Sequence, residues 1–270
     1  MSQQHHIDEL FVRIWNDYLL ITPSAEKVHA LLAASDTAPK IVNDHIALRT
    51  LNFPHMGISV LSQHFEALGY THGGDYDFGS KKLNAMHFEH PDGNHPKVFI
   101  SELKVDELSD TAQTILHRIS QSVTPELMSE SNCLYSGKCW KLTYNDYQNL
   151  LAESEYAAWF AAWGFRANHF TVSVNHLETL TELVEVNSLL KQHGFVLNTS
   201  GGEIKGSQDV CLAQSSTMAD KMPVVFNDQT VDIPSCFYEF AQRYPLPNGE
   251  LYQGFVAASA DKIFESTNVN

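Results

Sequence analysis

The segment NDHIALRT (residues 43–50) decides the fold, because its residues alternate in character as the two faces of a β-strand do. His45 and Arg49 share one face of this predicted strand, whereas Ile46 and Leu48 belong to the other. An apolar face predicts packing against a helix. A polar face that carries a histidine and an arginine predicts a wet cavity or a bound ligand, since buried polar groups need partners.

A second segment, ANHFTVSVN (residues 167–175), repeats this alternation in the second half of the chain. Each segment is followed by a predicted helix that ends at a glycine. Gly69 lies 24 positions after His45 (69 − 45), and Gly194 lies 25 positions after His169 (194 − 169). Further strand-like segments follow each helix, so each half reads β-α-β-β-β and indicates duplication of one unit.

The strand candidates of the first half after its helix are KKLNAMHFEH (81–90) and KVFISELKV (97–105), preceded by HGGDYD (72–77). Those of the second half are TSGGEIKGS (199–207), DVCLAQSS (209–216), PVVFND (223–228) and SCFYEFAQRY (235–244). Neither half can bury its sheet face alone. We therefore predict an α+β fold in which two β-α-β-β-β modules form one incomplete barrel.

The whole chain is expected to be a single domain. Apolar residues at helical spacing predict two helices before the first strand, separated at Thr22-Pro23-Ser24, where a stop and a new N-cap are expected. The predicted segments are N-terminal helices at 1–40, the first module at 41–105, a helical insert at 106–165, the second module at 166–258 and a tail at 259–270.

Composition excludes several classes of protein. The chain has 32 acidic and 17 basic residues, and its net charge of −15 disfavours binding to nucleic acids and to anionic membranes. The N-terminus MSQQHHIDEL lacks the layout of a signal peptide, and the most apolar run, AAWFAAWGF (157–165), is too short to cross a bilayer. We expect a cytoplasmic protein. Reduced, mostly buried thiols are expected for Cys133, Cys139, Cys211 and Cys236.

Glu239 is the most informative acidic residue, because it sits between Tyr238 and Phe240 in an apolar strand. Glutamate is almost never buried without a partner, and a metal ion would supply one. For His45 alone, a structural histidine is the simpler interpretation. The repeat at His169 and the position of Glu239 favour a metal site, since two imidazoles and a carboxylate form the facial set of non-haem Fe(II) enzymes.

Four short motifs occur along the chain: DHIALRT (44–50), NHF (168–170), QSSTMAD (214–220) and YEFAQR (238–243). In combination they resemble the 2-oxoadipate dioxygenase/decarboxylase family, also called hydroxyglutarate synthase, which has a paired fold of the vicinal-oxygen-chelate type. The resemblance covers roughly residues 7–255.

This resemblance implies Fe(II) held by His45, His169 and Glu239, with Arg49 gripping a substrate carboxylate. It further implies conversion of 2-oxoadipate and O₂ to 2-hydroxyglutarate and CO₂, a step of lysine degradation. Zn(II), Ni(II) or another divalent metal is not excluded by this ligand set. The better-known members are longer, and we expect the substrate contacts of their C-terminal extension to be missing here.

Other residues keep two interpretations open. Arg243, four positions after Glu239, is expected either to bind substrate or to neutralise a buried acid. Ser215, with its neighbours in QSST, is expected either to bond to the substrate or to cap a turn. Glu102 remains a candidate for a fourth ligand or for the true carboxylate. Loop positions on a solvated hairpin are expected for His87, His90 and His95.

Three functions are therefore compared. The first is an Fe(II)-dependent dioxygenase/decarboxylase acting on a 2-oxo dicarboxylic acid. The second is a glyoxalase-like lyase or hydrolase that uses Zn(II) or Ni(II) without O₂, since one fold supports several chemistries. The third is a small-molecule binding protein without a metal.

Overall fold

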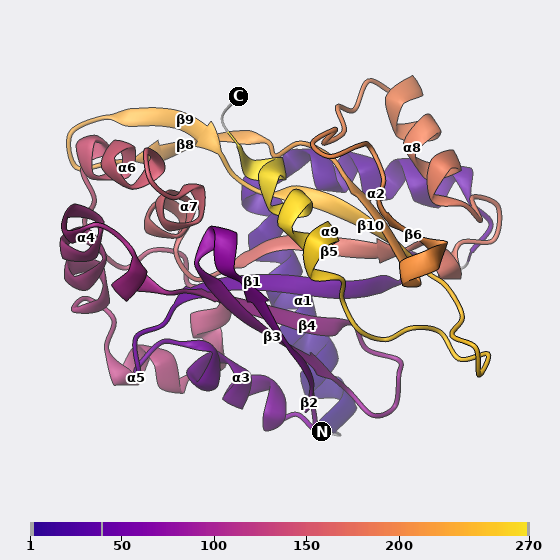
Figure 1. Ribbon diagram of the computed structural model, residues 1–270, viewed down its shortest axis with the longest axis horizontal. Coiled ribbons are helices and arrows are strands. Elements are labelled where there is room, and N and C mark those ends of the chain that lie inside the picture. Colours follow the sequence, from indigo (N-terminus) through magenta and orange to yellow (C-terminus); the bar gives the residue numbers. More distant parts are fainter. Residues whose placement is uncertain (1–2, 39, 269–270) are drawn as a thin grey trace.

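The computed structural model of this chain describes residues 3–38 and 40–268 (Figure 1). Its α-helices are α1 (Gln3–Ile21), α2 (Pro23–Ser35), α3 (Ile58–Glu66), α4 (Asp110–Ser120), α5 (Pro125–Ser129), α6 (Tyr144–Leu151), α7 (Glu155–Trp163), α8 (Leu183–Gln192) and α9 (Ala257–Ile263). Its strands are β1 (Asn43–Leu51), β2 (Thr71–Phe78), β3 (Leu83–Glu89), β4 (Lys97–Leu103), β5 (Ala167–Ser173), β6 (Lys205–Ser207), β7 (Leu212–Ser216), β8 (Lys221–Val225), β9 (Thr230–Pro234) and β10 (Phe237–Arg243). A 3₁₀-helix, η6 (Phe264–Thr267), follows α9.

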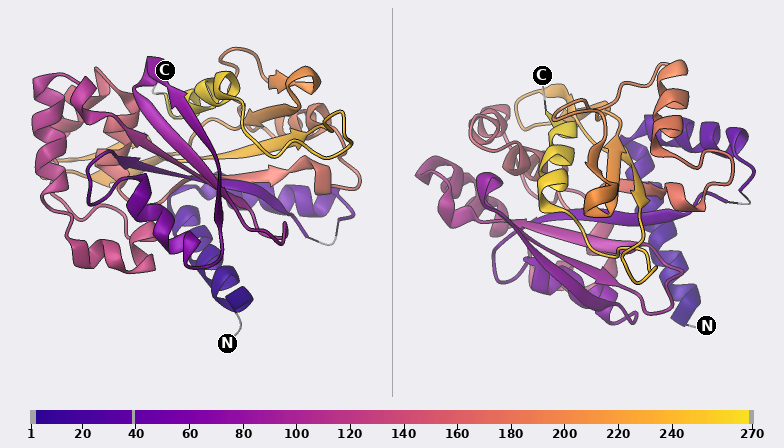
Figure 2. Two further views of the ribbon diagram at one scale, coloured as in Figure 1. Left: turned by 60° about the horizontal axis from the view of Figure 1, so that its bottom comes forward. Right: turned by 45° about the vertical axis from the view of Figure 1, so that its right-hand side comes forward.

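The main sheet has eight strands in the order β2-β3-β4-β1-β5-β10-β7-β6. The first four come from the first module and the last four from the second, so the predicted duplication is confirmed. β1 pairs in parallel with β4, and β10 pairs in parallel with β5, while β1 and β5 meet antiparallel at the centre. The sheet curls into an incomplete barrel, as the sequence predicts (Figure 2).

The second module differs from the prediction in its third strand. Only the first half of the segment PVVFND belongs to a strand, β8, which pairs with the unpredicted β9 in a separate two-stranded sheet. The backbone N–H of Asn227, in the turn of this hairpin, donates to the carbonyl of Leu142 in the helical insert. A strand-like pattern reveals a strand but not its partner, and Pro223 lacks the N–H that a central strand would need.

The convex face of the main sheet is apolar and lies on the N-terminal helices. Trp15 and Tyr18 of α1 contact Phe170 of β5, with ring centroids 4.8 Å and 5.0 Å apart. Ile46 and Leu48 are buried in the same core. Helix α1 runs beneath the sheet towards the N-terminus in the left view of Figure 2.

The break between the first two helices is confirmed, with Pro23 at the first position of α2. Thr22 precedes α2 as its N-cap residue but makes no side-chain capping bond. Pro at this position suits a helix start, because the first N–H groups of a helix have no intrahelical partner. The new N-cap therefore falls at Thr22, the first residue of the predicted break.

The insert at 106–165 is helical, as predicted, and contains α4 to α7. Helix α7 is buried on all sides, and the indole N–H of Trp163 donates to the carbonyl of Pro234 over 2.8 Å. The insert therefore packs tightly against the second module. Among the residues that the structure describes, no helix is both long enough and apolar enough to cross a membrane.

The concave face of the sheet is covered by α9, which follows the long loop after β10 (yellow in Figure 1). This helix contacts β6 and β7 near one edge of the sheet and β2 at the other. The segment predicted as a tail thus contains helical structure up to Thr267, and it closes the open side of the incomplete barrel.

Asp36, at the end of α2, ties the N-terminal helices to the second module. Its carboxylate accepts hydrogen bonds from the backbone N–H groups of Ala38, Glu178, Thr179 and Leu180, at 2.8–2.9 Å. Burial raises the pKa of Asp36, but these four bonds outweigh it and lower the pKa from 3.8 to about 2. The carboxylate form is therefore the one that the fold stabilises.

We predict that Asp36→Asn lowers the free energy of unfolding by about 1–2 kcal/mol at neutral pH, because charge-assisted bonds are lost. A depressed pKa contributes stability above 3.8 that disappears as the pH falls through about 2. Urea unfolding at pH 7, 4 and 2.5 should show a difference between wild type and variant that shrinks with acidity. A difference that stays constant across this range would contradict the assignment.

Candidate metal centre

Three neighbouring strands bring together His45, His169 and Glu239. In the β1–β5 pair, His45 lies opposite Thr171 and His169 lies opposite Ala47. In the β5–β10 pair, Glu239 lies opposite Thr171. Side chains that face each other across a ladder point to the same side of the sheet, so all three functional groups project into the concave face.

The three side chains are close enough to share one cation. His45 Nε2 lies 3.6 Å from Glu239 Oε1, and His169 Nε2 lies 3.1 Å from Glu239 Oε2. The candidate ligand atoms all lie within 4.8 Å of one another. Glu239 is 0% exposed, so its charge has no access to bulk water. We name these three residues the His-His-Glu cluster.

Each histidine of the cluster is oriented by the residue that precedes it. Asp44 Oδ1 lies 2.8 Å from His45 Nδ1, and Asn168 Oδ1 lies 2.9 Å from His169 Nδ1. An oxygen acceptor at Nδ1 holds the proton there and leaves Nε2 free to bind a metal. The dipeptides Asp-His and Asn-His thus prepare both imidazoles in the same tautomer.

Arg243 lies against Asp44 and acts on the cluster through it. Its Nε donates to Asp44 Oδ2 over 2.6 Å, and its Nη2 donates to Asp44 Oδ1 over 2.8 Å. Nη1 donates to the carbonyls of Tyr252 and Gly254. Of the two interpretations from the sequence, the structure favours the neutralisation of a buried acid, because the guanidinium is fully engaged by protein groups.

Electrostatics within the cluster favour a bound cation. Burial raises the pKa of Glu239 from 4.5 to about 7, so its carboxylate is destabilised in the cation-free protein. Burial, followed by the electrostatic influence of His45 and Arg49, lowers the pKa of His169 well below 6.5. A neutral imidazole beside a carboxylate that lacks a counter-charge is the state that a divalent cation stabilises.

The carboxylate oxygen Oε2 of Glu239 shows that the cluster suits a bound cation. Glu239 Oε2 is buried and forms no hydrogen bond, although it lies 3.1 Å from His169 Nε2. Unpaired buried acceptors are rare and costly. A cation between this oxygen and the two Nε2 atoms would satisfy it, and the donor set suits divalent transition metals, including Fe(II) and Zn(II).

Two further residues contact the cluster. Gln214 Nε2 donates to Glu239 Oε1 over 2.6 Å, and Thr171 Oγ1 lies 3.1 Å from His45 Nε2. Sequence reasoning missed Gln214, as it missed Asp44 and Asn168, although Gln214 begins the motif QSSTMAD. Strand alternation alone could not choose between Gln214 and Ser215, because the choice depends on the pairing of Ser216 with Glu239, which sets Gln214 on the same face.

Ser215, by the same alternation, points away from the cluster. Its hydroxyl donates to Asn187 Oδ1 of α8 over 2.6 Å, on the convex side of the sheet. The structure therefore does not bring Ser215 to the site.

Two other sequence candidates also lie elsewhere. Glu102 Oε2 accepts a hydrogen bond from the backbone N–H of Ile58 at the start of α3, over 2.9 Å, so it is neither a fourth ligand nor the carboxylate of the cluster. His87 is a buried residue of β3, 1% exposed, rather than a solvated loop histidine. Its Nδ1 lies 3.0 Å from the hydroxyl of Tyr76.

Arg49 is buried near the cluster, at 1% exposure. Its Nη1 donates to Glu155 Oε1 over 3.1 Å, and its Nη2 donates to Thr267 Oγ1 over 3.3 Å. The guanidinium also lies 4.8 Å from the ring centroid of Tyr156 and 4.9 Å from that of Trp159. An aromatic cage of this kind holds the planar fork in one orientation.

A cavity of about 20 Å³ lies directly beside the His-His-Glu cluster. Its roof consists of Phe255, Ala260, Ile263 and Phe264, and we call these four residues the roof. A cavity of this size holds about one water molecule. The roof therefore encloses the cluster tightly in this state of the protein.

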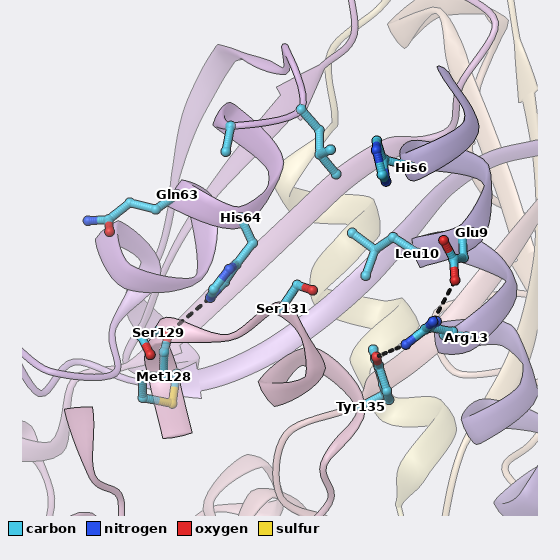
Figure 3. Close-up of a pocket in the computed structure, with 12 residues that line it drawn as sticks. His6, Glu9, Leu10, Arg13, Gln63, His64, Met128, Ser129, Ser131 and Tyr135 are labelled. Atoms are coloured by element: carbon cyan, nitrogen blue, oxygen red, sulfur yellow. Dashed lines mark hydrogen bonds and ion pairs between the residues drawn. The ribbon is translucent and has the colours of Figure 1, made fainter. Parts of the chain in front are cut away.

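A larger groove of about 700 Å³ lies between α1, α3 and the insert (Figure 3). Arg13 in this groove is paired with Glu9 and donates to Tyr135, and His64 Nε2 lies 3.0 Å from the carbonyl of Met128. Its charged groups are thus satisfied by one another, and we do not assign it a catalytic role.

Comparisons with known proteins agree with this geometry. A family model described as 2-oxoadipate dioxygenase/decarboxylase matches residues 17–132 and 131–250. A chloroplastic/amyloplastic protein of Oryza sativa subsp. japonica with the same name is 36% identical over 93% of this chain and 76% of its own length.

Solved structures show the same relationship. Hydroxyglutarate synthase from Oryza sativa, in complex with 2-oxoadipate, is similar with a TM-score of 0.93 and 34% identity, over 99% of this chain and 93% of that chain. A Shewanella frigidimarina NCIMB 400 protein, provisionally described as a hydrolase, has a TM-score of 0.89 and 56% identity, over 93% of this chain and 98% of that chain. A glyoxalase-superfamily structure from Ralstonia eutropha JMP134, at 24% identity and a TM-score of 0.72, shares the fold.

We predict that Asp44→Asn weakens the binding of Co(II) to the cation-free protein by about 10–100-fold, because the acceptor on His45 Nδ1 loses its charge. Asn168→Ala tests the other imidazole and should have the smaller effect, since a neutral amide is lost. Titration of each variant with Co(II), monitored through the absorption of the bound ion, measures both affinities. Equal affinities for wild type and Asp44→Asn would contradict the proposed orienting role.

Proposed function

Because the chain belongs to the 2-oxoadipate dioxygenase/decarboxylase family, we propose that it oxidatively decarboxylates 2-oxoadipate at the His-His-Glu cluster. The products are 2-hydroxyglutarate and CO₂, with O₂ as the oxidant, as a step of lysine degradation. The observation that carries this proposal is the buried group of two imidazoles and one carboxylate with an unpaired oxygen.

His45, His169 and Glu239 would hold Fe(II) as the native metal. When bound there, iron would supply the redox chemistry that oxidative decarboxylation of a 2-oxo acid by O₂ requires. The neighbouring side chains orient these three ligands. Asp44 and Asn168 keep the Nδ1 protons of the two imidazoles in place, and Gln214 holds one oxygen of Glu239.

Arg49 is proposed to bind the far carboxylate of the substrate. A guanidinium can match a carboxylate through two parallel charge-assisted hydrogen bonds, whereas Arg49 contacts the two oxygens of Glu155 through Nη1 alone, at 3.1 and 3.4 Å. The substrate carboxylate would replace Glu155, which is the more exposed partner at 20% against 1% for Arg49. The aromatic cage around Arg49 would then fix the length of chain between this carboxylate and the cluster.

The roof must move before a six-carbon acid can reach the cluster, because the cavity holds about one water molecule. Once the roof returns, Phe255, Ile263 and Phe264 would exclude bulk water from the reacting carbon atoms. Exclusion of water strengthens the electrostatic contacts in the site and prevents side reactions with water.

A hydrolase that uses the same cluster without O₂ is the second candidate. It is favoured by the provisional description of the Shewanella frigidimarina relative, which is 56% identical. A cytoplasmic location also belongs to this proposal. The Oryza relative is named chloroplastic/amyloplastic, so cell fractionation is the measurement that tests the location.

We predict that anaerobically prepared protein loaded with Fe(II) consumes O₂ when 2-oxoadipate is added. One O₂ should disappear for each CO₂ and each 2-hydroxyglutarate formed, because the atoms of both substrates are then balanced. An oxygen electrode combined with mass spectrometry of the products measures this ratio.

His45→Ala should abolish this turnover, whereas His193→Ala, at an exposed histidine after α8, should leave it unchanged. Turnover of 2-oxoadipate under argon would refute the dioxygenase and favour the hydrolase. Ligand binding by metal-free protein without any turnover would favour a binding protein.

We predict that Arg49→Lys raises the KM for 2-oxoadipate at least tenfold, because a bidentate pair becomes a single contact and the aromatic cage loses its planar partner. The same variant should have little effect on 2-oxohexanoate, which lacks the far carboxylate. Steady-state kinetics with both acids test this. A KM that rises equally for both substrates would show that Arg49 acts on the shape of the site rather than on the carboxylate.

A further inference from the structure

The loop between β3 and β4 gathers a second group of potential ligands, outside the His-His-Glu cluster. His90, Asp92 and His95 lie in the turn HPDGNH, and their candidate ligand atoms all lie within 4.8 Å of one another. We propose that these three residues, which we call the loop triad, form a second site for a divalent transition metal of the Zn(II) type. This inference is independent of the reaction proposed for the cluster.

The spacing of the ligand atoms supports this inference. His90 Nδ1 lies 2.8 Å from Asp92 Oδ1, and His95 Nδ1 lies 3.1 Å from the same oxygen. Tetrahedral zinc sites with metal–ligand distances of about 2.0–2.1 Å place neighbouring ligand atoms roughly 3.3 Å apart. The two separations from Asp92 Oδ1, 2.8 and 3.1 Å, lie within about half an ångström of this value, so a cation can take the place of the two shared protons with little movement of Asp92 relative to each imidazole.

The loop triad is also held in place by its surroundings. The side chain of His95 is only 4% exposed, and that of His90 is 14% exposed. The ring of His90 packs edge-on against Tyr70 at 5.3 Å and against His95 at 4.8 Å. The backbone N–H of Asn94 donates to Asp92 Oδ1 over 2.9 Å. A site with fixed ligands loses little conformational entropy when a cation binds.

A carboxylate on α1 completes the arrangement. His95 Nε2 lies 3.6 Å from Asp8 Oδ1. An imidazole that binds a metal through Nδ1 keeps its proton on Nε2, and metal-bound histidines almost always donate that proton to a carboxylate, carbonyl or water. The exposed side chain of Asp8 would need to move closer by a few tenths of an ångström to accept it. A cation in the loop triad would thus join the β3–β4 hairpin to the N-terminal helix.

The chemistry of the donors indicates which cations fit. Two imidazole nitrogens and one carboxylate oxygen suit Zn(II), Co(II) or Ni(II), whereas Mg(II) and Ca(II) prefer sites made of oxygen atoms. The loop triad lies at the rim of an open groove of about 880 Å³, whose lining also includes Asp44 and Arg243. Water from this groove can occupy the remaining coordination positions.

The test is the stoichiometry of Co(II) and Zn(II) binding to the cation-free full chain, measured by calorimetry and by Co(II) absorption. Wild type is expected to bind two ions per chain, and His45→Ala is expected to bind one, at the loop triad. His90→Gln and Asp92→Asn should each also bind one, at the His-His-Glu cluster. His193→Ala, which removes an exposed histidine elsewhere, should still bind two.

Asp8→Asn gives a second test, because it leaves all three side chains of the loop triad in place. It is expected to weaken the second binding event about tenfold and to leave the first unchanged. Zn(II) should also slow hydrogen exchange of the β3–β4 loop in the His45→Ala protein. Loss of all binding in His45→Ala, or unchanged second-site affinity in both His90→Gln and Asp92→Asn, would overturn the proposal.

Discussion

The antiparallel pairing of β1 with β5 is the constraint on which the functional part of this structure depends. It joins the two modules at the centre of one sheet and sets His45 opposite Thr171. Because side chains alternate strictly along a strand, a slip of one residue would turn one imidazole into the apolar core. The burial of Ile46 and Phe170 on the convex face therefore fixes where the Nε2 atoms of His45 and His169 point.

The sequence predicts most of the fold and of the cluster, because both rest on alternation and on duplication. Two strands with the same polar and apolar order, each followed by a helix that ends at a glycine, indicate the paired modules. Glu239 is found because an acid in an apolar strand demands a partner. These are local signals, and tertiary packing does not override them.

What the sequence cannot predict are partners that come together only in three dimensions. PVVFND looks like a strand of the main sheet, yet it pairs with β9 against the helical insert. Arg243 is paired with Asp44, 199 residues away in the chain, and no pattern links the two. Ser215 was a candidate because of its neighbours, but register, which depends on the partner strand, turns Gln214 inward instead.

Helix α9 touches both margins of the curled sheet, at β2 on one side and at β6 and β7 on the other. It therefore acts as a brace across an arc. The curvature of the sheet and the enclosure of the His-His-Glu cluster are therefore linked. If the two edges of the sheet moved apart, Ile263 and Phe264 would be lifted away from the imidazoles of His45 and His169. A change in the curvature of the sheet would therefore change how tightly the helix encloses the His-His-Glu cluster.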